Sequence, residues 1–257
     1  MAESTNESPT APIAETPSPP RLKKSFEAWT KAFIGEISLS GKENIAEAKR
    51  SGKPILVVST HISDLDVPVA VGTLAKDLDM VIAHISGQRH FRTDPLTRVG
   101  LAVAGEENFI PIDFSKISSG WSAGPFNSLN FVPMVTALKE GKAVFIAAHS
   151  PVRNNILPPK GGVGAVYLSH LADDAIILPV AVDIGVKRED IGKNTGTFKL
   201  LSKRPSAHLT IGAPFQLPPL TSLNKEALRD QSAILMQNLA SMLPVEKRGT
   251  WNQPTLD

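Results

Sequence analysis

The chain has 257 residues, of which 42% are hydrophobic, and a formal net charge of +2. This apolar content suffices for one α/β domain or two small ones, and one domain is the simpler interpretation. The sequence contains no cysteine, which excludes a disulfide scaffold, a thiol nucleophile and cysteine-ligated zinc, and is compatible with a reducing compartment. The small charge argues against nucleic-acid binding, and no run of about 18 apolar residues predicts a transmembrane helix.

The first 22 residues are expected to form a disordered tail. Residues 1–20 are rich in Pro, Ser, Thr and Glu and lack the basic and apolar segments of a signal peptide. Four apolar residues then recur at helical spacing: Phe26, Trp29, Phe33 and Ile37. They predict a helix over about 23–37, preceded by basic residues, which either packs on the domain, the alternative we favour, or lies on a membrane surface.

The rest of the chain alternates short apolar runs with segments of helical periodicity. Strands are expected at 37–39, 54–58, 80–84, 108–112, 143–147, 176–182 and 208–211, and helices at 43–50, 67–78, 94–103, 131–140, 163–172 and 224–242. This order predicts one α/β domain over 23–243, with a central mixed, mostly parallel sheet flanked by helices, and a C-terminal tail over 244–257. In such folds a site lies at the carboxyl ends of the strands. Pro179 has no N–H to donate and therefore predicts an edge position or a bulge in its strand.

A histidine and an aspartate stand five residues apart where a predicted strand gives way to a predicted helix. Within one helix, residues at that spacing would point about 140° apart, so His61 and Asp66 can pair only if the helix begins after Asp66. Pro68 is best tolerated in the first turn of a helix, which supports that start and places Asp66 at the N-cap. Taken alone, the spacing favours a helix-capping aspartate beside a hydrogen-bonded histidine, and Asp64 is a rival partner.

Several motifs resemble, in order, those of the glycerolipid and lysophospholipid acyltransferase family, which includes 1-acylglycerol-3-phosphate acyltransferases. The family's first block is a His, four residues and an Asp, usually with Ser two after the His, as in His61-Ile62-Ser63-Asp64-Leu65-Asp66. The others are Gly41-Lys42-Glu43-Asn44-Ile45, Asn108-Phe109-Ile110-Pro111-Ile112-Asp113, Pro159-Lys160-Gly161-Gly162, Ile177-Leu178-Pro179-Val180 and Leu209-Thr210-Ile211-Gly212-Ala213-Pro214. The resemblance covers about 39–217 and implies the family's α/β fold.

The second and third blocks depart from the family pattern. Phe114 stands where the second block usually has an arginine, and the segment 145–150 lacks the Glu and the Arg of the third block. The resemblance implies that those family residues hold the phosphate and polar head of the acceptor, so their loss leaves the acceptor open, a phosphate-bearing acceptor most of all. His149 replaces a threonine, and Arg153 lies three residues beyond the position of the missing arginine. A rebuilt polar site is therefore one interpretation.

The resemblance implies transfer of a fatty acyl group from an acyl thioester to a hydroxyl of a lysophospholipid, glycerol phosphate or related lipid precursor. The donor would be acyl-coenzyme A or an acyl-carrier protein, and no cofactor or metal is expected. A neutral imidazole with a pKa of about 6.5 suits removal of the hydroxyl proton, so His61 is the expected base and Asp66 the group that fixes its tautomer. The oxyanion would take backbone N–H groups near a helix start, or a cation. The expected substrate-binding residues are Ser63, His149, Arg153, Lys160 and Gly161.

Two other functions remain open on the same fold. The altered second and third blocks also fit a non-catalytic lipid-binding or scaffolding protein, and water in place of the acceptor would give an acyl-thioester hydrolase. The sequence contains no phosphate-binding P-loop, no Gly-x-Ser-x-Gly elbow and no His-Glu-x-x-His motif. We expect a cytoplasmic protein, with peripheral contact at the inner face of the membrane as an alternative, and no nucleic-acid partner.

Overall fold

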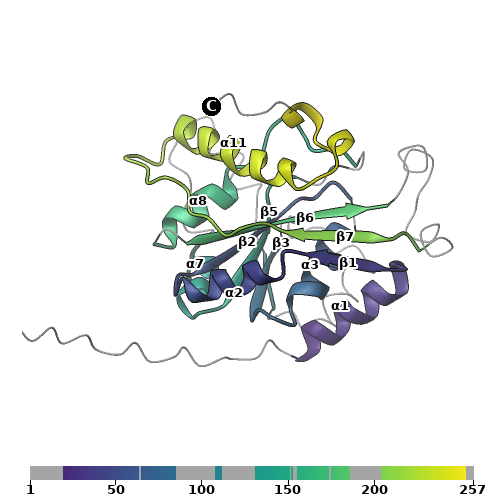
Figure 1. The fold of residues 1–257 in the computed structure, drawn as a ribbon. Coiled ribbons are helices and arrows are strands. Elements are labelled where there is room, and N and C mark those ends of the chain that lie inside the picture. Colours follow the sequence, from purple (N-terminus) through teal and green to yellow (C-terminus); the bar gives the residue numbers. More distant parts are fainter. Residues whose placement is uncertain are drawn as a thin grey trace, which may run out of the picture.

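The computed structural model describes residues 20–63, 65–84, 108–111, 131–150, 152, 155–173, 175–185 and 204–252. The strands in these ranges form a seven-stranded sheet in the order β1-β7-β6-β2-β5-β3-β4. Figure 1 shows the fold that contains this sheet. The strands are β1 (Ile37–Ser40), β2 (Ile55–Ser59), β3 (Met80–His84), β4 (Phe109–Pro111), β5 (Ala143–Ala147), β6 (Ile176–Ile184) and β7 (Ala207–Ile211). Every neighbouring pair is parallel except β6 and β7. The prediction of an α/β domain with a mixed, mostly parallel sheet is confirmed.

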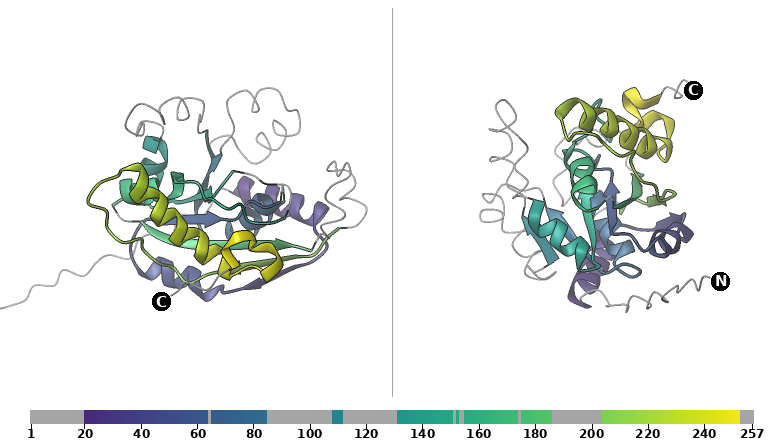
Figure 2. Two further views of the ribbon diagram at one scale, coloured as in Figure 1. Left: turned by 90° about the horizontal axis from the view of Figure 1, so that it is seen from above. Right: turned by 90° about the vertical axis from the view of Figure 1, so that its left-hand side faces the viewer.

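Helices cover both faces of this sheet (Figures 1 and 2). One face carries α1 (Pro20–Phe33), α2 (Glu43–Arg50) and α3 (Asp66–Leu74), and the other carries α7 (Val132–Lys139), α8 (Gly164–Leu171) and α11 (Lys225–Ser241). Two 3-10 helices, η3 (Val245–Lys247) and η4 (Gly249–Asn252), follow α11. The buried apolar side chains form two clusters, one under each layer of helices. The sheet is therefore the middle layer of a three-layer domain.

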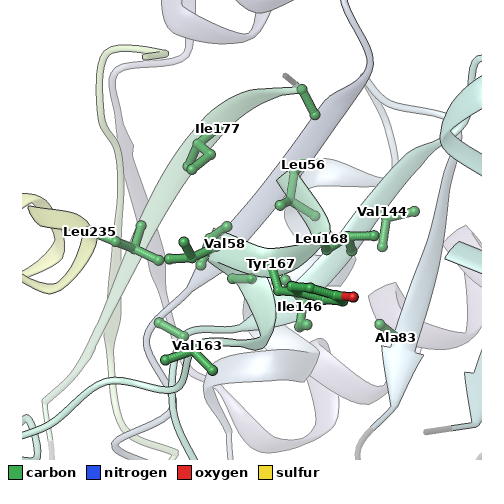
Figure 3. Packing of buried hydrophobic residues seen from close by; sticks show 14 of the residues in the cluster. Leu56, Val58, Ala83, Val144, Ile146, Val163, Tyr167, Leu168, Ile177 and Leu235 are labelled. Atoms are coloured by element: carbon green, nitrogen blue, oxygen red, sulfur yellow. The ribbon is translucent and has the colours of Figure 1, made fainter. Parts of the chain in front are cut away.

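The central strand β2 is buried on both of its faces. Leu56 and Val58 belong to the cluster under α7, α8 and α11, where Figure 3 shows them with Ile146 and Tyr167. Val57 belongs to the opposite cluster. An apolar run without alternation is what a parallel strand with two covered faces requires. Because full burial of each such side chain contributes about 1.5–3 kcal/mol, the strand that leads into the candidate site is held firmly.

Pro179 lies in an interior strand, so the expectation of an edge position is wrong. β6 stands between β7 and β2. Its antiparallel ladder with β7 begins only at Val180, and the carbonyl of Pro179 accepts the N–H of Gly212, after β7 has ended (2.9 Å). Pairing resumes as an isolated bridge between Ile177 and Phe215. The missing N–H of Pro179 thus coincides with an interruption of the ladder, where no donor is required.

Some element boundaries differ from those expected. α1 begins at Pro20, and α3 ends at Leu74 where the periodicity predicts 78. The chain is ordered beyond the expected start of a tail at 244, because η3 and η4 make hydrogen bonds back to residues 157 and 158. The helix expected at 94–103 lies outside the described residues.

A glycine joins β1 to α2 in the segment that resembles the start of the family pattern. Gly41 has a φ of +74°, and a Cβ built there would lie 1.9 Å from the carbonyl oxygen of Ile211. The same carbonyl accepts a hydrogen bond from Asn44 Nδ2 (2.8 Å). Gly41 and Asn44 are therefore explained by the close approach of α2 to the end of β7.

Candidate functional site

The two site histidines meet because they follow neighbouring strands at the same distance. β2 and β5 are parallel, with Ser59 opposite Ala147. His61 and His149 each stand two residues beyond those positions, at the carboxyl edge of the sheet. The main-chain N–H of His61 donates to Nε2 of His149 (3.2 Å). The equal offset from two adjacent strand ends was the signal in the sequence that could have predicted this contact.

His149 acts as a neutral hydrogen-bond acceptor in this arrangement. Its side chain is 4% exposed, and its Nδ1 donates to the carbonyl of Ser150 (2.8 Å), which leaves the lone pair on Nε2 for the His61 N–H. Burial lowers the pKa of His149 to about 4, against the opposing effect of the hydrogen bond to Ser150 and with a smaller lowering from the charge of His61. The ring therefore fixes the main chain of His61 and is not protonated near neutral pH.

Asp66 is fully buried at the start of α3, and its carboxyl group binds the turn that precedes the helix. Oδ2 accepts the N–H groups of Ile62 (2.7 Å) and Ser63 (3.1 Å). Oδ1 has no hydrogen-bond partner among the described residues. Burial raises the pKa of Asp66 well above its ordinary value of 3.8, although the two amides oppose the rise.

The ring of His61 is oriented by a carbonyl group. Its Nδ1 lies 3.1 Å from the carbonyl oxygen of Ser63. Because a carbonyl only accepts, this bond requires the proton on Nδ1, which puts the lone pair of the neutral ring on Nε2. In this structure Ser63 thus fixes the tautomer, the role that the sequence assigned to Asp66. The Asp66 carboxyl contributes by holding the peptide of Ser63 in place.

Ser63 is the centre of the turn between β2 and α3. Its carbonyl also accepts the N–H of Asp66 (3.2 Å), and its Oγ accepts the N–H of Leu65 (3.2 Å). α3 begins at Asp66, with Leu65 at the N-cap, one residue before the expected cap. The Asp66 side chain caps the preceding turn instead of the helix.

The backbone amides of this turn are used within the protein. The N–H of Thr60 donates to the Val180 carbonyl, and the N–H of His61 donates to His149 Nε2. The N–H groups of Ile62 and Ser63 both donate to Asp66 Oδ2. The N–H of Leu65 donates to Ser63 Oγ, and the N–H of Asp66 donates to the Ser63 carbonyl. An oxyanion bound beside His61 would therefore need donors from outside these six amides, and a side-chain cation is one type of donor that the sequence indicates.

The turn after the third block lies against the end of β5. Gly162 donates its N–H to the carbonyl of Ala148 (2.7 Å). A Cβ at Gly161 would lie 2.5 Å from Met236 Cγ and 2.6 Å from Ser232 Oγ, so a side chain at this position would displace these two side chains of α11. The adjacent Lys160 is exposed. The backbone of the predicted Lys-Gly-Gly turn is thus next to His149, with a cation at its start.

The described residues that flank 153–154 both bind the His61 turn. Val152 donates its N–H to the carbonyl of His61 (3.0 Å), and Asn155 donates to the carbonyl of Ile62 (3.2 Å). Arg153 itself lies outside the described residues, as do Asp64 and Phe114. In the described ranges, no group of three or more His, Asp or Glu side chains is arranged to hold a metal ion.

This chain has a structural counterpart among known proteins. No protein-family model matches the chain, and no curated protein matches it. The chain is similar to the crystal structure of the 1-acyl-sn-glycerophosphate (LPA) acyltransferase, PlsC, from Thermotoga maritima, with 16% sequence identity and a TM-score of 0.49. The match covers 83% of this chain and 76% of that chain.

Replacing His149 by glutamine would keep an acceptor for the His61 N–H and remove the titrating ring. Because the folded-state pKa of about 4 lies below the ordinary value of 6.5, the wild type loses stability as the pH falls from 6.5 towards 4, by roughly 3 kcal/mol at about 1.4 kcal/mol per pKa unit. Urea unfolding at several pH values should therefore show that the free energy of unfolding of His149→Gln rises relative to that of the wild type as the pH falls across this window. A constant difference between the two proteins would contradict the neutral-acceptor interpretation.

Proposed function

We propose that this protein transfers a fatty acyl group from an acyl thioester to a hydroxyl group of a lipid or lipid precursor. The observation that carries the proposal is the state of His61: its main chain is fixed by His149, its Nδ1 is bound to the Ser63 carbonyl, and its lone pair is on Nε2 at the carboxyl edge of the sheet. The ordered motifs of the sequence support the substrate classes, namely acyl-coenzyme A or an acyl-carrier protein as donor, and a lysophospholipid, glycerol phosphate or related molecule as acceptor.

In the proposed reaction, His61 Nε2 removes the proton of the acceptor hydroxyl as that oxygen attacks the thioester carbonyl carbon. The tetrahedral intermediate then collapses with cleavage of the carbon–sulfur bond. The leaving thiolate takes the proton from the imidazolium, so the products are an ester and a free thiol. The Ser63 carbonyl, which accepts from Nδ1 (3.1 Å), would stabilise the imidazolium in between.

The negative oxygen of the intermediate needs a donor, and we propose a side-chain cation. The amides of the turn around His61 are engaged with other groups, as described above. Lys160 is exposed beside the end of β5, and Arg153 belongs to the same stretch of sequence. Either cation could also bind a phosphate of the donor or acceptor, because guanidinium and ammonium groups form strong charge-assisted hydrogen bonds.

Replacing His61 by alanine is expected to lower turnover by roughly 10²-fold to 10⁴-fold or more while the protein stays folded, because general-base catalysis contributes about that much. Release of free thiol from an acyl thioester, with and without hydroxyl acceptors, is the measurement. His208→Ala is the matched control, since His208 is exposed on β7, where Ser38 Oγ lies 2.7 Å from its Nδ1. Unchanged turnover in His61→Ala would remove His61 from the mechanism.

Replacing Asp66 by asparagine should cost less activity than removing His61. An amide oxygen can still accept from the N–H groups of Ile62 and Ser63, and the Ser63 carbonyl can still hold His61. The same thiol-release assay measures the effect. A loss as large as that of His61→Ala would mean that the charge of Asp66 acts directly on the imidazole and that the role assigned here to Ser63 is wrong.

Peripheral contact with an anionic membrane is a second part of the proposal. Within the described residues, no helix has the length and apolar composition needed to cross a bilayer. α1 packs on α3, with Thr30 buried and its hydroxyl 3.5 Å from the Pro68 carbonyl, as the docked alternative predicts. The sequence nevertheless places Arg21, Lys23 and Lys24 together at the start of α1.

We expect the triple replacement of Arg21, Lys23 and Lys24 by glutamine to weaken sedimentation with anionic liposomes, because each basic residue near such a surface contributes about 1 kcal/mol. Thiol release from a soluble donor should be unchanged, since none of the three residues belongs to the candidate site. Equal sedimentation of the triple variant and the wild type would exclude these residues as the membrane contact.

A further inference from the structure

The main chain around Lys160 is held by hydrogen bonds on both sides of this residue. On its C-terminal side, the N–H of Gly162 donates to the carbonyl of Ala148 (2.7 Å). On its N-terminal side, the carbonyl of Pro158 accepts a hydrogen bond from Nε1 of Trp251 in η4 (2.8 Å). Both contacts lie two residues from Lys160, which is itself exposed. This cation therefore extends from a main chain that is fixed between the end of β5 and the C-terminal turns.

The segment 155–158 is bound both to the C-terminal turns and to the turn after β2. The N–H of Leu157 donates to the carbonyl of Lys247 in η3 (2.8 Å). The N–H of Asn155 donates to the carbonyl of Ile62 (3.2 Å), the residue that follows the site histidine. Main-chain hydrogen bonds thus connect η3 to the candidate site through this segment.

The C-terminal turns are themselves anchored on the domain. The ammonium group of Lys247 forms an ion pair with Asp183 near the end of β6 and donates to the carbonyl of Ile184 (2.9 Å). The side chain of Trp251 packs against the apolar cluster under α7, α8 and α11. Because η3 and η4 are fixed to the sheet and to the core, they can support the segment that leads to Lys160.

We propose that Trp251 is a positioning residue for Lys160: by binding the carbonyl of Pro158 it fixes the main chain from which the substrate-binding cation extends. A fixed main chain reduces the conformational entropy that is lost when the ammonium group binds an anionic oxygen of the substrate. Trp251 lies beyond the region 39–217 that resembles the acyltransferase family, so the resemblance assigns it no role. The action on Lys160 rests on the function proposed above, whereas the support of 155–158 does not.

Amide hydrogen exchange, measured by NMR, tests the support without any substrate. Gly249 of η4 has a φ of +59°, and a Cβ there would lie 2.5 Å from the carbonyl oxygen of Leu157. Gly249→Ala should push the two apart, so exchange at the amides of Leu157 and Asn155 should become several-fold faster. The Val182 amide, which donates to Thr60 Oγ1 within the sheet (3.1 Å), is the internal reference and should exchange as in the wild type.

Gly52→Ala is the matched control. Gly52 also has a positive φ, +66°, but no atom of the described residues lies within 4 Å of a Cβ built there. Its replacement introduces similar backbone strain between α2 and β2, without the contact to Leu157, and should leave exchange at Leu157 and Asn155 unchanged. Unchanged exchange in Gly249→Ala, or equal acceleration in both variants or at Val182, would overturn the support. Trp251→Phe, which removes the indole N–H, replaces Gly249→Ala if that variant does not fold.

The thiol-release assay tests the action of Trp251 on Lys160 through a double-mutant cycle. Trp251→Phe should lower kcat/KM by about 2-fold to 10-fold in the wild-type background, the range that corresponds to the loss of one hydrogen bond. In the Lys160→Ala background the same replacement should have little effect, because the residue through which it acts is gone. An equal loss in both backgrounds would overturn the positioning role, as would wild-type activity in Lys160→Ala.

The two experiments fail independently. If the wild-type protein releases no thiol from any acyl thioester, the proposed function fails. The exchange rates at Leu157 and Asn155 would still decide whether the C-terminal turns support the segment 155–158.

Discussion

The geometry of the candidate site depends on the burial of one carboxyl group. Asp66 is inaccessible to solvent, and its Oδ2 accepts the N–H groups of Ile62 and Ser63. A buried polar group costs free energy unless it is hydrogen-bonded, so the carboxyl fixes the path of the chain as it leaves β2. The carbonyl of Ser63 is thereby placed to accept from His61 Nδ1. The direction of the imidazole follows from the same constraint.

The second constraint on the candidate site is the pairing of β2 with β5. Because these strands are parallel neighbours, His149 contacts the main chain of His61. Burial keeps His149 neutral, so it acts as a hydrogen-bond acceptor, while the lone pair of His61 is on Nε2. The two buried groups respond oppositely to acid. The buried neutral His149 makes the free energy of unfolding decrease as the pH falls from 6.5 towards 4. Burial of Asp66 has the opposite effect, because the cost of burying its ionised form is relieved as the pH falls through its raised pKa towards 3.8.

Local patterns predicted most of the fold because the determinants of its elements are local. The apolar run of β2, the helical periodicity of α11 and the Gly41 turn each depend on residues that are close together in the sequence. Each element occurs close to where it was expected. Pro179 predicted either an edge position or a bulge, and local sequence does not distinguish the two, because the interruption that tolerates this proline is created by Gly212 and Phe215, more than 30 residues away.

The site could be predicted only in part for the same reason. The His61–Asp66 spacing identified the turn, but a five-residue spacing does not distinguish a carboxyl that binds the imidazole from one that binds two backbone amides. His61 and His149 stand at equal offsets from the ends of their strands in the sequence, but the pairing of β2 with β5 that brings them together is a property of the fold. The approach of Lys247 to Asp183 is set by how η3 returns to the sheet, and no local pattern indicates it.

If His61 activates an acceptor hydroxyl for attack on an acyl thioester, the reaction product is an ester, so identification of the product is the decisive measurement. Purified protein would be incubated with acyl-coenzyme A or acyl-carrier protein and a panel of lysolipid, glycerol-phosphate and non-phosphorylated acceptors, and the products identified by mass spectrometry. We expect a new ester whose mass is that of one acceptor plus the acyl group. Free fatty acid alone would indicate a hydrolase, and intact thioester with bound lipid would indicate a non-catalytic protein; either result would exclude acyl transfer to a hydroxyl.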